Sequence, residues 1–198
     1  MEKRKTKRYG VNKTRTIAVN FLVIILIGAV LLTLPISSRE GQWTDFMTAL
    51  FTATSASCVT GLVLEDTFSH WSVFGQILII VMIQIGGLGT IAMRILLATF
   101  LKRNITLKAR NLLQESINSL QIGGVVRLIR QALKGTLLFE GAGAFVMAFY
   151  FVPRLGWGRG IYYSIFHAIS AFCNAGFDLM GYQGEYVSFV SAADHPLI

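Results

Sequence analysis

Two stretches of this sequence, each with a glycine just before its last residue, hold the residues most suited to a binding function, and they align with each other without a gap. The first, FMTALFTATSASCVTGL, runs from Phe46 to Leu62, and the second, IYYSIFHAISAFCNAGF, runs from Ile161 to Phe177. Each position of the second lies 115 residues after its counterpart, so Gly61 corresponds to Gly176. A match at a fixed period indicates that one structural unit occurs twice. We expect each unit to be a short re-entrant helix followed by an extended loop, whose backbone carbonyl oxygens suit the lining of an ion pathway.

Side chains suited to catalysis are missing from the sequence pattern. The three histidines are scattered, and the two cysteines, Cys58 and Cys173, occupy matching repeat positions. Their spacing suggests neither a zinc site nor a disulfide framework, and no base is placed to activate the loop hydroxyls as nucleophiles. We therefore expect no enzyme activity and no cofactor. His167, inside the second stretch, is interpreted as a packed or hydrogen-bonded core residue rather than a ligand.

Composition and charge placement predict a membrane protein. Hydrophobic residues make up 54% of the chain and charged residues only 14%, which is too apolar for an ordinary soluble domain. Most of the 18 Lys and Arg residues fall in the N-terminal tail or between residues 102 and 134. Basic clusters that flank long apolar runs follow the positive-inside rule. Such clusters also occur in nucleic-acid-binding proteins, but no nucleic-acid-binding motif accompanies them here, so we expect no nucleic-acid partner.

Three apolar segments are expected to cross the membrane, at residues 17–34, 73–101 and 136–152. Between the first two, a helix from Asp45 to Ser57 is expected, with Thr44 as its cap. At ~1.5 Å per residue this helix reaches only about 20 Å, too short to cross. Its many Thr and Ser residues are tolerated at membrane depth only when buried in protein or facing a water-filled cavity. Trp71 is expected to be an interfacial aromatic anchor.

The resulting topology is a multi-pass, all-α protein of the cell membrane, with a cytoplasmic N-terminus and both short helices entering from outside. This arrangement leaves both basic clusters on the cytoplasmic side, as the positive-inside rule requires. The expected segments are a basic tail (1–16), a first helix–pore-loop–helix unit (17–101), a cytoplasmic connector (102–135), the first helix and loop of a second unit (136–187), and the start of a further segment (188–198).

Five residues are candidates for a hinge or a gate. Gly86, Gly87 and Gly89 lie close together in the second apolar segment, where small residues favour close helix contact or a bend. Arg94 follows in the same segment, and we expect it to snorkel to the inner face, with a role in gating as the alternative. Glu140 lies near the inner end of the third segment and is a candidate partner for Arg94, because ionisable residues at membrane depth usually face a partner.

Four motifs make the chain resemble a known transporter family. They are LPISS at residues 34–38, FTATSASCVTGLVLEDT at 51–67, QIGGLG at 84–89 and ISAFCNAGFDL at 169–179. Together they resemble the Trk/Ktr/HKT superfamily, whose unit of helix, pore helix, filter loop and helix is that of potassium channels. The short basic N-terminus makes the chain most similar to the KtrB-type membrane subunit. The resemblance covers about residues 10 to 190.

The resemblance implies potassium uptake through a pore built from four such units in one polypeptide. Each unit contributes one filter strand with a single glycine, whose carbonyl groups replace the water shell of the ion. The C-terminal ends of the pore helices, near Ser57 and Phe172, direct partial negative charge at the cavity. The family further implies a homodimer, contact with membrane lipid and a cytosolic nucleotide-binding regulatory subunit. The implied filter residues are Val59, Thr60, Gly61, Asn174, Ala175 and Gly176.

The chain departs from the family pattern because it holds about one and a half units. We expect it to be the N-terminal part of a longer protein, the alternatives being a truncated gene or an assembly of two or more copies. The rival functions are a non-conducting small membrane scaffold and an inactive fragment. Channel-like flux, sodium symport and proton coupling all fit these residues, and potassium is favoured over sodium through the resemblance alone.

Overall fold

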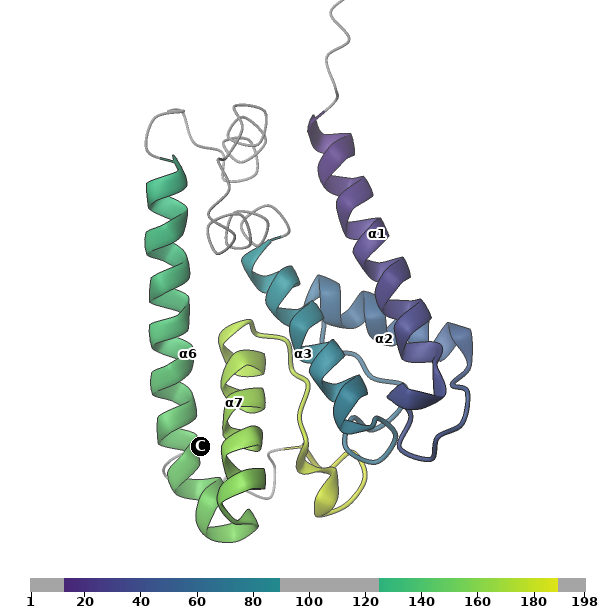
Figure 1. The fold of residues 1–198 in the computed structure, drawn as a ribbon, viewed down its shortest axis with the longest axis vertical. Coiled ribbons are helices and arrows are strands. Elements are labelled where there is room, and N and C mark those ends of the chain that lie inside the picture. Colours follow the sequence, from purple (N-terminus) through teal and green to yellow (C-terminus); the bar gives the residue numbers. More distant parts are fainter. Residues whose placement is uncertain (1–12, 90–124, 189–198) are drawn as a thin grey trace, which may run out of the picture.

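The structure, a computed structural model, describes residues 13–89 and 125–188, and this part of the chain is helical without a named strand (Figure 1). The all-α prediction is therefore confirmed for the described residues. Arg94 and most of the predicted connector lie outside them. The elements are α1 (Lys13–Thr33), the 3₁₀ helix η1 (Pro35–Ser37), α2 (Phe46–Cys58), α3 (Val73–Leu88), α6 (Val125–Leu155), α7 (Trp157–Phe172) and the 3₁₀ helix η2 (Met180–Tyr182).

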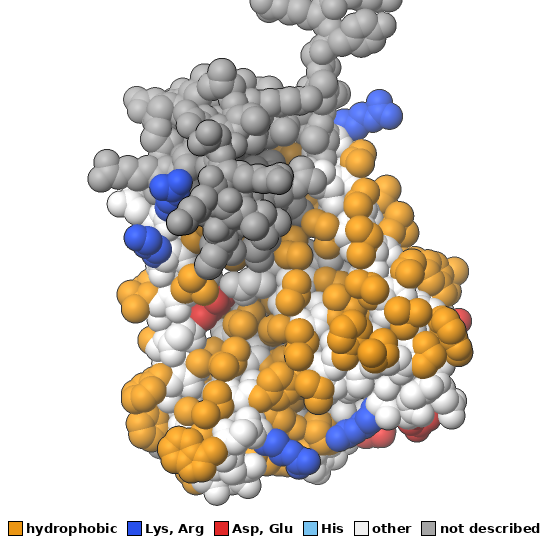
Figure 2. Space-filling model, viewed as in Figure 1, with side chains coloured by type: hydrophobic (Ala, Val, Ile, Leu, Met, Phe, Trp, Pro, Cys, Tyr) orange, Lys and Arg blue, Asp and Glu red, His pale blue; other side chains and the backbone are white. Residues whose placement is uncertain are grey.

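One described helix is long and apolar enough to cross a membrane, namely the 26-residue part of α6 from Arg130 to Leu155. Two further apolar helices, Ile17–Thr33 and Val73–Leu88, are shorter than a clear span. The rest of the segment predicted at 73–101 lies outside the described residues. Figure 2 shows hydrophobic side chains over much of the visible described face, with Lys and Arg toward its ends. An apolar surface of this extent marks contact with lipid or with other protein.

Helix α2 begins one residue later than expected because Asp45, not Thr44, is its cap. The Asp45 carboxylate accepts hydrogen bonds from the N–H groups of Met47 (2.9 Å) and Thr48 (3.2 Å). These are two of the N–H groups that a helix leaves unpaired at its start. The hydroxyl of Thr44 instead lies 3.1 Å from Nε2 of His70. The prediction of a Thr44 cap is therefore wrong.

Helices α6 and α7 form an antiparallel pair (Figure 1). α6 begins at Val125, well inside the predicted connector, so the helix is longer than the segment 136–152. Gly156, with φ of +78°, separates the two helices. The turn is tight: a Cβ atom on Gly160 would lie 2.5 Å from Cα of Val152. Only glycine lets the first turn of α7 approach the end of α6 this closely.

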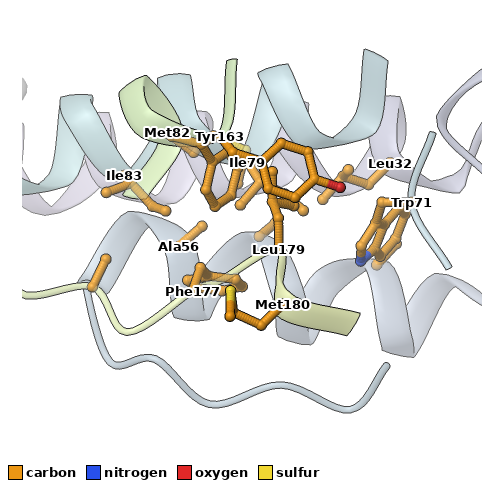
Figure 3. Packing of buried hydrophobic residues seen from close by; sticks show 14 of the residues in the cluster. Leu32, Ala56, Trp71, Ile79, Met82, Ile83, Tyr163, Phe177, Leu179 and Met180 are labelled. Atoms are coloured by element: carbon orange, nitrogen blue, oxygen red, sulfur yellow. The ribbon is translucent and has the colours of Figure 1, made fainter. Parts of the chain in front are cut away.

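The core lies where α1, α2, α3, the end of α6, α7 and the segment after α7 meet (Figure 3). Trp71 is 1% exposed and belongs to this cluster, together with Leu179 and Met180 from the segment after α7. The prediction of Trp71 as an interfacial anchor is therefore wrong, since an anchor must reach the membrane surface. Trp157, by contrast, is 77% exposed.

Candidate functional site

The two predicted loops leave the C-terminal ends of α2 and α7 with matching φ angles at equivalent positions. Val59 and Asn174, which occupy equivalent repeat positions, both have φ of 57°. Two residues further on, Gly61 and Gly176 have φ of 74° and 75°. Left-handed backbone at these four positions turns each loop sharply away from its helix. The sequence repeat is thus also a repeat of loop geometry.

A pair of buried serines fixes the start of each loop. The N–H of Thr60 donates to the carbonyl of Ser55 (3.0 Å), and the N–H of Ala175 donates to the carbonyl of Ser170 (2.7 Å). The serine hydroxyls add one bond each: Ser55 accepts from the Thr60 hydroxyl at 3.0 Å, and Ser170 donates to the Phe177 carbonyl at 2.6 Å. Ser55 and Ser170 were not predicted as site residues, although the sequence repeat places a serine at both equivalent positions and could have indicated their role.

The tertiary structure brings the backbones of the two loops into contact. A Cβ atom added to Gly61 would lie 2.5 Å from the carbonyl oxygen of Ala175, and one added to Gly176 would lie 3.4 Å from Cα of Gly61. No side chain fits between the loops at this point. Gly61 of the first repeat and Ala175 and Gly176 of the second therefore meet in space, although they are far apart in the sequence.

Val59 holds a conformation that β-branched residues rarely adopt. Its φ of 57° and ψ of 44° are left-handed, and positive φ in such a residue is an outlier. Strain of this kind costs on the order of 1–3 kcal/mol and clusters at functional sites. Asn174, its counterpart in the second loop, tolerates this conformation more easily. Because Val59 lies in one of the two repeated loops, its strained backbone supports a functional role for that loop.

The end of α3 packs against the start of both loops. A Cβ on Gly86 would overlap the carbonyl of Ser57 at the end of α2, and a Cβ on Gly87 would lie 2.6 Å from Sγ of Cys173. Gly89, with φ of +81°, follows the end of the helix and has open space around it. The close contact predicted for this glycine cluster is therefore present at Gly86 and Gly87, and the hinge function stays a prediction.

Glu140 is buried, with 6% of its surface exposed, in the middle of α6. The side-chain amide of Gln84 on α3 donates to both carboxylate oxygens, at 2.8 and 3.1 Å. The predicted partner, Arg94, lies outside the described residues. Gln84, which was not predicted as a site residue, is therefore the hydrogen-bond partner that the described structure assigns to Glu140.

His167 is a hydrogen-bonded core residue, as predicted. It is 1% exposed, its Nδ1 lies 2.8 Å from the carbonyl of Tyr163, and its Nε2 accepts from the N–H of Leu179 at 2.9 Å. Because Nε2 accepts a hydrogen bond, the proton of the neutral ring belongs on Nδ1, where it is donated to Tyr163. His167 thereby ties the segment after the second loop to the body of α7.

The chain segments that follow the two loops are linked through Asp66. Its carboxylate accepts from the N–H groups of Phe68 (3.0 Å), Ser69 (2.8 Å) and Tyr186 (3.3 Å). The Tyr186 hydroxyl also donates to the carbonyl of Leu64 at 3.0 Å. Asp66 is only 7% exposed, so its carboxylate joins the segments that follow the two loops and is not open to solvent.

A second carboxyl group lies close to this link. Burial raises the pKa of Asp178 above its usual range, the charge of Asp66 raises it further, and a hydrogen bond from the Met180 N–H (2.8 Å) acts in the opposite direction. Within the described part of the chain, no group of three or more His, Cys, Asp or Glu residues is placed to hold a metal ion.

These features define a class: an all-α protein with membrane character, whose candidate site consists of two repeated glycine loops. Comparison with known proteins gives the family. A match to TrkH, described as Cation transport protein, covers residues 1–193. The chain belongs to the TrkH family of cation transport proteins.

Curated relatives agree with this assignment. The chain is 46% identical over 181 residues to the potassium/sodium uptake protein NtpJ of Enterococcus hirae, an alignment that covers 91% of this chain and 40% of the relative. It is 44% identical over 177 residues to the Ktr system potassium uptake protein B of Bacillus subtilis (86% and 39% covered) and 38% identical over 177 residues to that of Vibrio alginolyticus (89% and 38% covered). The chain thus spans about two fifths of the length of these relatives.

Proposed function

We propose that this chain forms part of the pore of a Ktr-type system that takes up potassium across the cell membrane. The observation that carries the proposal is the backbone contact between Gly61 and the Ala175–Gly176 segment, at the ends of two equivalent helices. Relatives named as potassium or potassium/sodium uptake proteins support potassium as the substrate. In such a pore the two loops act as two filter strands, and further strands come from segments beyond those described here.

Cation selection would depend on backbone dipoles. Carbonyl oxygens of the loops replace part of the water shell of potassium, and because each carries only a partial charge the ion can leave again. The C-terminal ends of α2 and α7 add partial negative charge of about half an elementary charge each. The proposed ion-binding residues are Val59, Thr60, Gly61, Asn174, Ala175 and Gly176.

The arrangement in the membrane follows from the same proposal. α1, α3 and α6 are membrane helices, α2 and α7 are pore helices that enter from outside, and the N-terminus is cytoplasmic. The Ktr systems named among the relatives support a partner protein, which we take to be a cytosolic nucleotide-binding subunit. A homodimer in contact with membrane lipid completes the proposed assembly.

The test is ion uptake by the complete polypeptide that contains this segment. We would express it in cells that lack their own potassium uptake systems, and measure growth on limiting potassium and the uptake of potassium, rubidium and sodium. Growth rescue with saturable potassium or rubidium uptake is the expected result. Protein that reaches the membrane but moves none of these ions above the empty-vector level would contradict the proposal and favour a non-conducting scaffold.

A further inference from the structure

A chain of three side chains connects α6, α3 and the first residue of the second loop. Glu140 on α6 accepts two hydrogen bonds from the Gln84 amide nitrogen, at 2.8 and 3.1 Å. The Gln84 amide oxygen in turn lies 3.7 Å from Sγ of Cys173, which donates to it. Cys173 directly precedes the proposed filter residue Asn174. One buried carboxylate is thus linked through one amide to the base of a loop.

The orientation of Gln84 is fixed by its two neighbours. A carboxylate accepts hydrogen bonds, and a thiol offers a proton, so the amide nitrogen must face Glu140 and the amide oxygen must face Cys173. Gly87, one helical turn further along α3, contacts Cys173 on the same side. The Cys173 side chain is therefore held between Gln84 and Gly87, and small movements of the loop base are resisted.

The first loop has a different environment at the equivalent position. Cys58, the repeat counterpart of Cys173, is exposed, whereas Cys173 is partly buried. Within the described residues the Cys58 thiol makes no side-chain hydrogen bond, and the first loop is held by the bond between the hydroxyls of Thr60 and Ser55 instead. The chain of three residues therefore belongs to the second loop and joins the two repeats.

We propose that Glu140 is a positioning residue, which acts through Gln84 on Cys173 to hold the second loop in its ion-selective shape. This inference rests on the proposed potassium uptake function. A carboxylate buried at membrane depth is costly and marks a functional position. Groups that orient ion ligands from behind typically change ion affinity 10- to 100-fold when they are removed.

The experiment compares two substitutions at Glu140 in the complete polypeptide, measured as potassium and sodium uptake. Glu140→Gln retains an oxygen that accepts from Gln84, so half-saturation for potassium should stay within about twofold of the original. Glu140→Leu removes the acceptor and should raise half-saturation about tenfold, with a lower preference for potassium over sodium. Leu138→Ala is the matched control, because Leu138 lies on the same helix and is 70% exposed.

A double-substitution test isolates the route of action. If Glu140 acts through Cys173, then Glu140→Leu should add less than a twofold effect in a Cys173→Ala background, since coupled residues are not additive. If Glu140→Leu does not accumulate in the membrane, Glu140→Leu combined with Gln84→Leu tests the whole route at once, because replacing both partners by apolar groups is far better tolerated. Unchanged potassium affinity in this double variant would overturn the proposal.

Each outcome has a defined meaning. The proposal is overturned if Glu140→Gln is as impaired as Glu140→Leu, if the Cys173→Ala background leaves the full effect in place, or if Glu140→Leu transports as the original does. All three cases leave the proposed function standing, because the unsubstituted protein still transports potassium. Failure of the unsubstituted protein to transport any of the tested ions would instead contradict the proposed function itself.

Discussion

Substitution of Gly61 by alanine perturbs a point where the two loops touch. The new methyl group would lie 2.5 Å from the carbonyl oxygen of Ala175, whereas ordinary van der Waals contact begins at 3.4 Å. The obstacle is a backbone atom, which cannot rotate away as the end of a side chain can. We therefore expect the Ala175 carbonyl to move by about 1 Å, a displacement comparable to those that disrupt positioned functional groups.

Two energetic effects must be separated in this prediction. Alanine at positive φ costs about 1–2 kcal/mol, partly offset by about 0.4–1 kcal/mol from the stiffer unfolded chain. Gly41 has φ of +71° and nothing within 4 Å of an added Cβ. Gly41→Ala therefore carries the cost of alanine at positive φ without a clash. Gly61→Ala should additionally weaken potassium binding about 10- to 100-fold, as loss of ligand orientation does at metal sites.

The assay measures potassium and sodium uptake against external concentration for Gly61→Ala, Gly41→Ala and the unsubstituted protein. The three are compared at equal amounts of protein in the membrane. Gly61→Ala should raise half-saturation for potassium and lower the preference for potassium over sodium, while Gly41→Ala should alter neither. Gly176→Ala should be intermediate, because its added Cβ meets the backbone of Gly61 at 3.4 Å.

Two results would refute this reasoning. If Gly61→Ala reaches the membrane and transports with unchanged affinity and selectivity, the loop contact is not part of the ion pathway. If Gly41→Ala is impaired to the same degree, the effect belongs to positive φ in general and not to the contact with Ala175.

Three further predictions concern stability. Val59→Asn should increase the free energy of unfolding by about 0.5–1 kcal/mol, because asparagine tolerates the left-handed backbone that Asn174 already adopts. The increase should appear as a higher thermal midpoint in detergent. A lower midpoint would show that the packing of the valine outweighs its strain. His167→Phe should destabilise by about 1–3 kcal/mol because the N–H of Leu179 loses its buried acceptor, and unchanged thermal stability would contradict this. Because the pKa of Asp178 is raised in the folded protein, its contribution to the free energy of unfolding is most favourable below about pH 4 and is lost as pH rises through the folded-state pKa. Asp178→Asn should therefore remove this pH dependence from thermal midpoints measured between pH 4 and 7. An unchanged pH dependence would contradict the assignment of the raised pKa to burial.

The helical elements were largely predictable because local sequence signals mark them. Apolar runs, Pro35 after α1 and Gly61 after α2 fixed the element types. The boundaries were less predictable: α6 begins at Val125 instead of residue 136. Helical propensity continues through this polar stretch, and a change in hydropathy marks a membrane boundary, not the end of a helix.

Burial was the property that sequence patterns predicted least well. Trp71 fits the pattern of an interfacial anchor, yet it lies in the core. Asp66 is an acidic residue in a polar stretch, yet it is buried, and its carboxylate accepts hydrogen bonds from Phe68 and Tyr186. Both residues are buried by segments distant in the sequence. Sequence patterns of aromatic and acidic residues indicate chemistry, but they do not specify which other segment covers a side chain.

The repeat of two glycine loops was determined by the sequence alone, because residue identity and spacing are sufficient to detect it. Positive φ at Gly61 and Gly176 follows locally, since glycine is the residue that adopts it without cost. Only the tertiary structure decided that Gly61 meets Ala175 and that Gln84 is the partner of Glu140. It also decided that Gly86 and Gly87 contact the start of the two loops. The physical reason is that contacts between distant segments depend on helix packing in three dimensions, which a linear pattern does not encode.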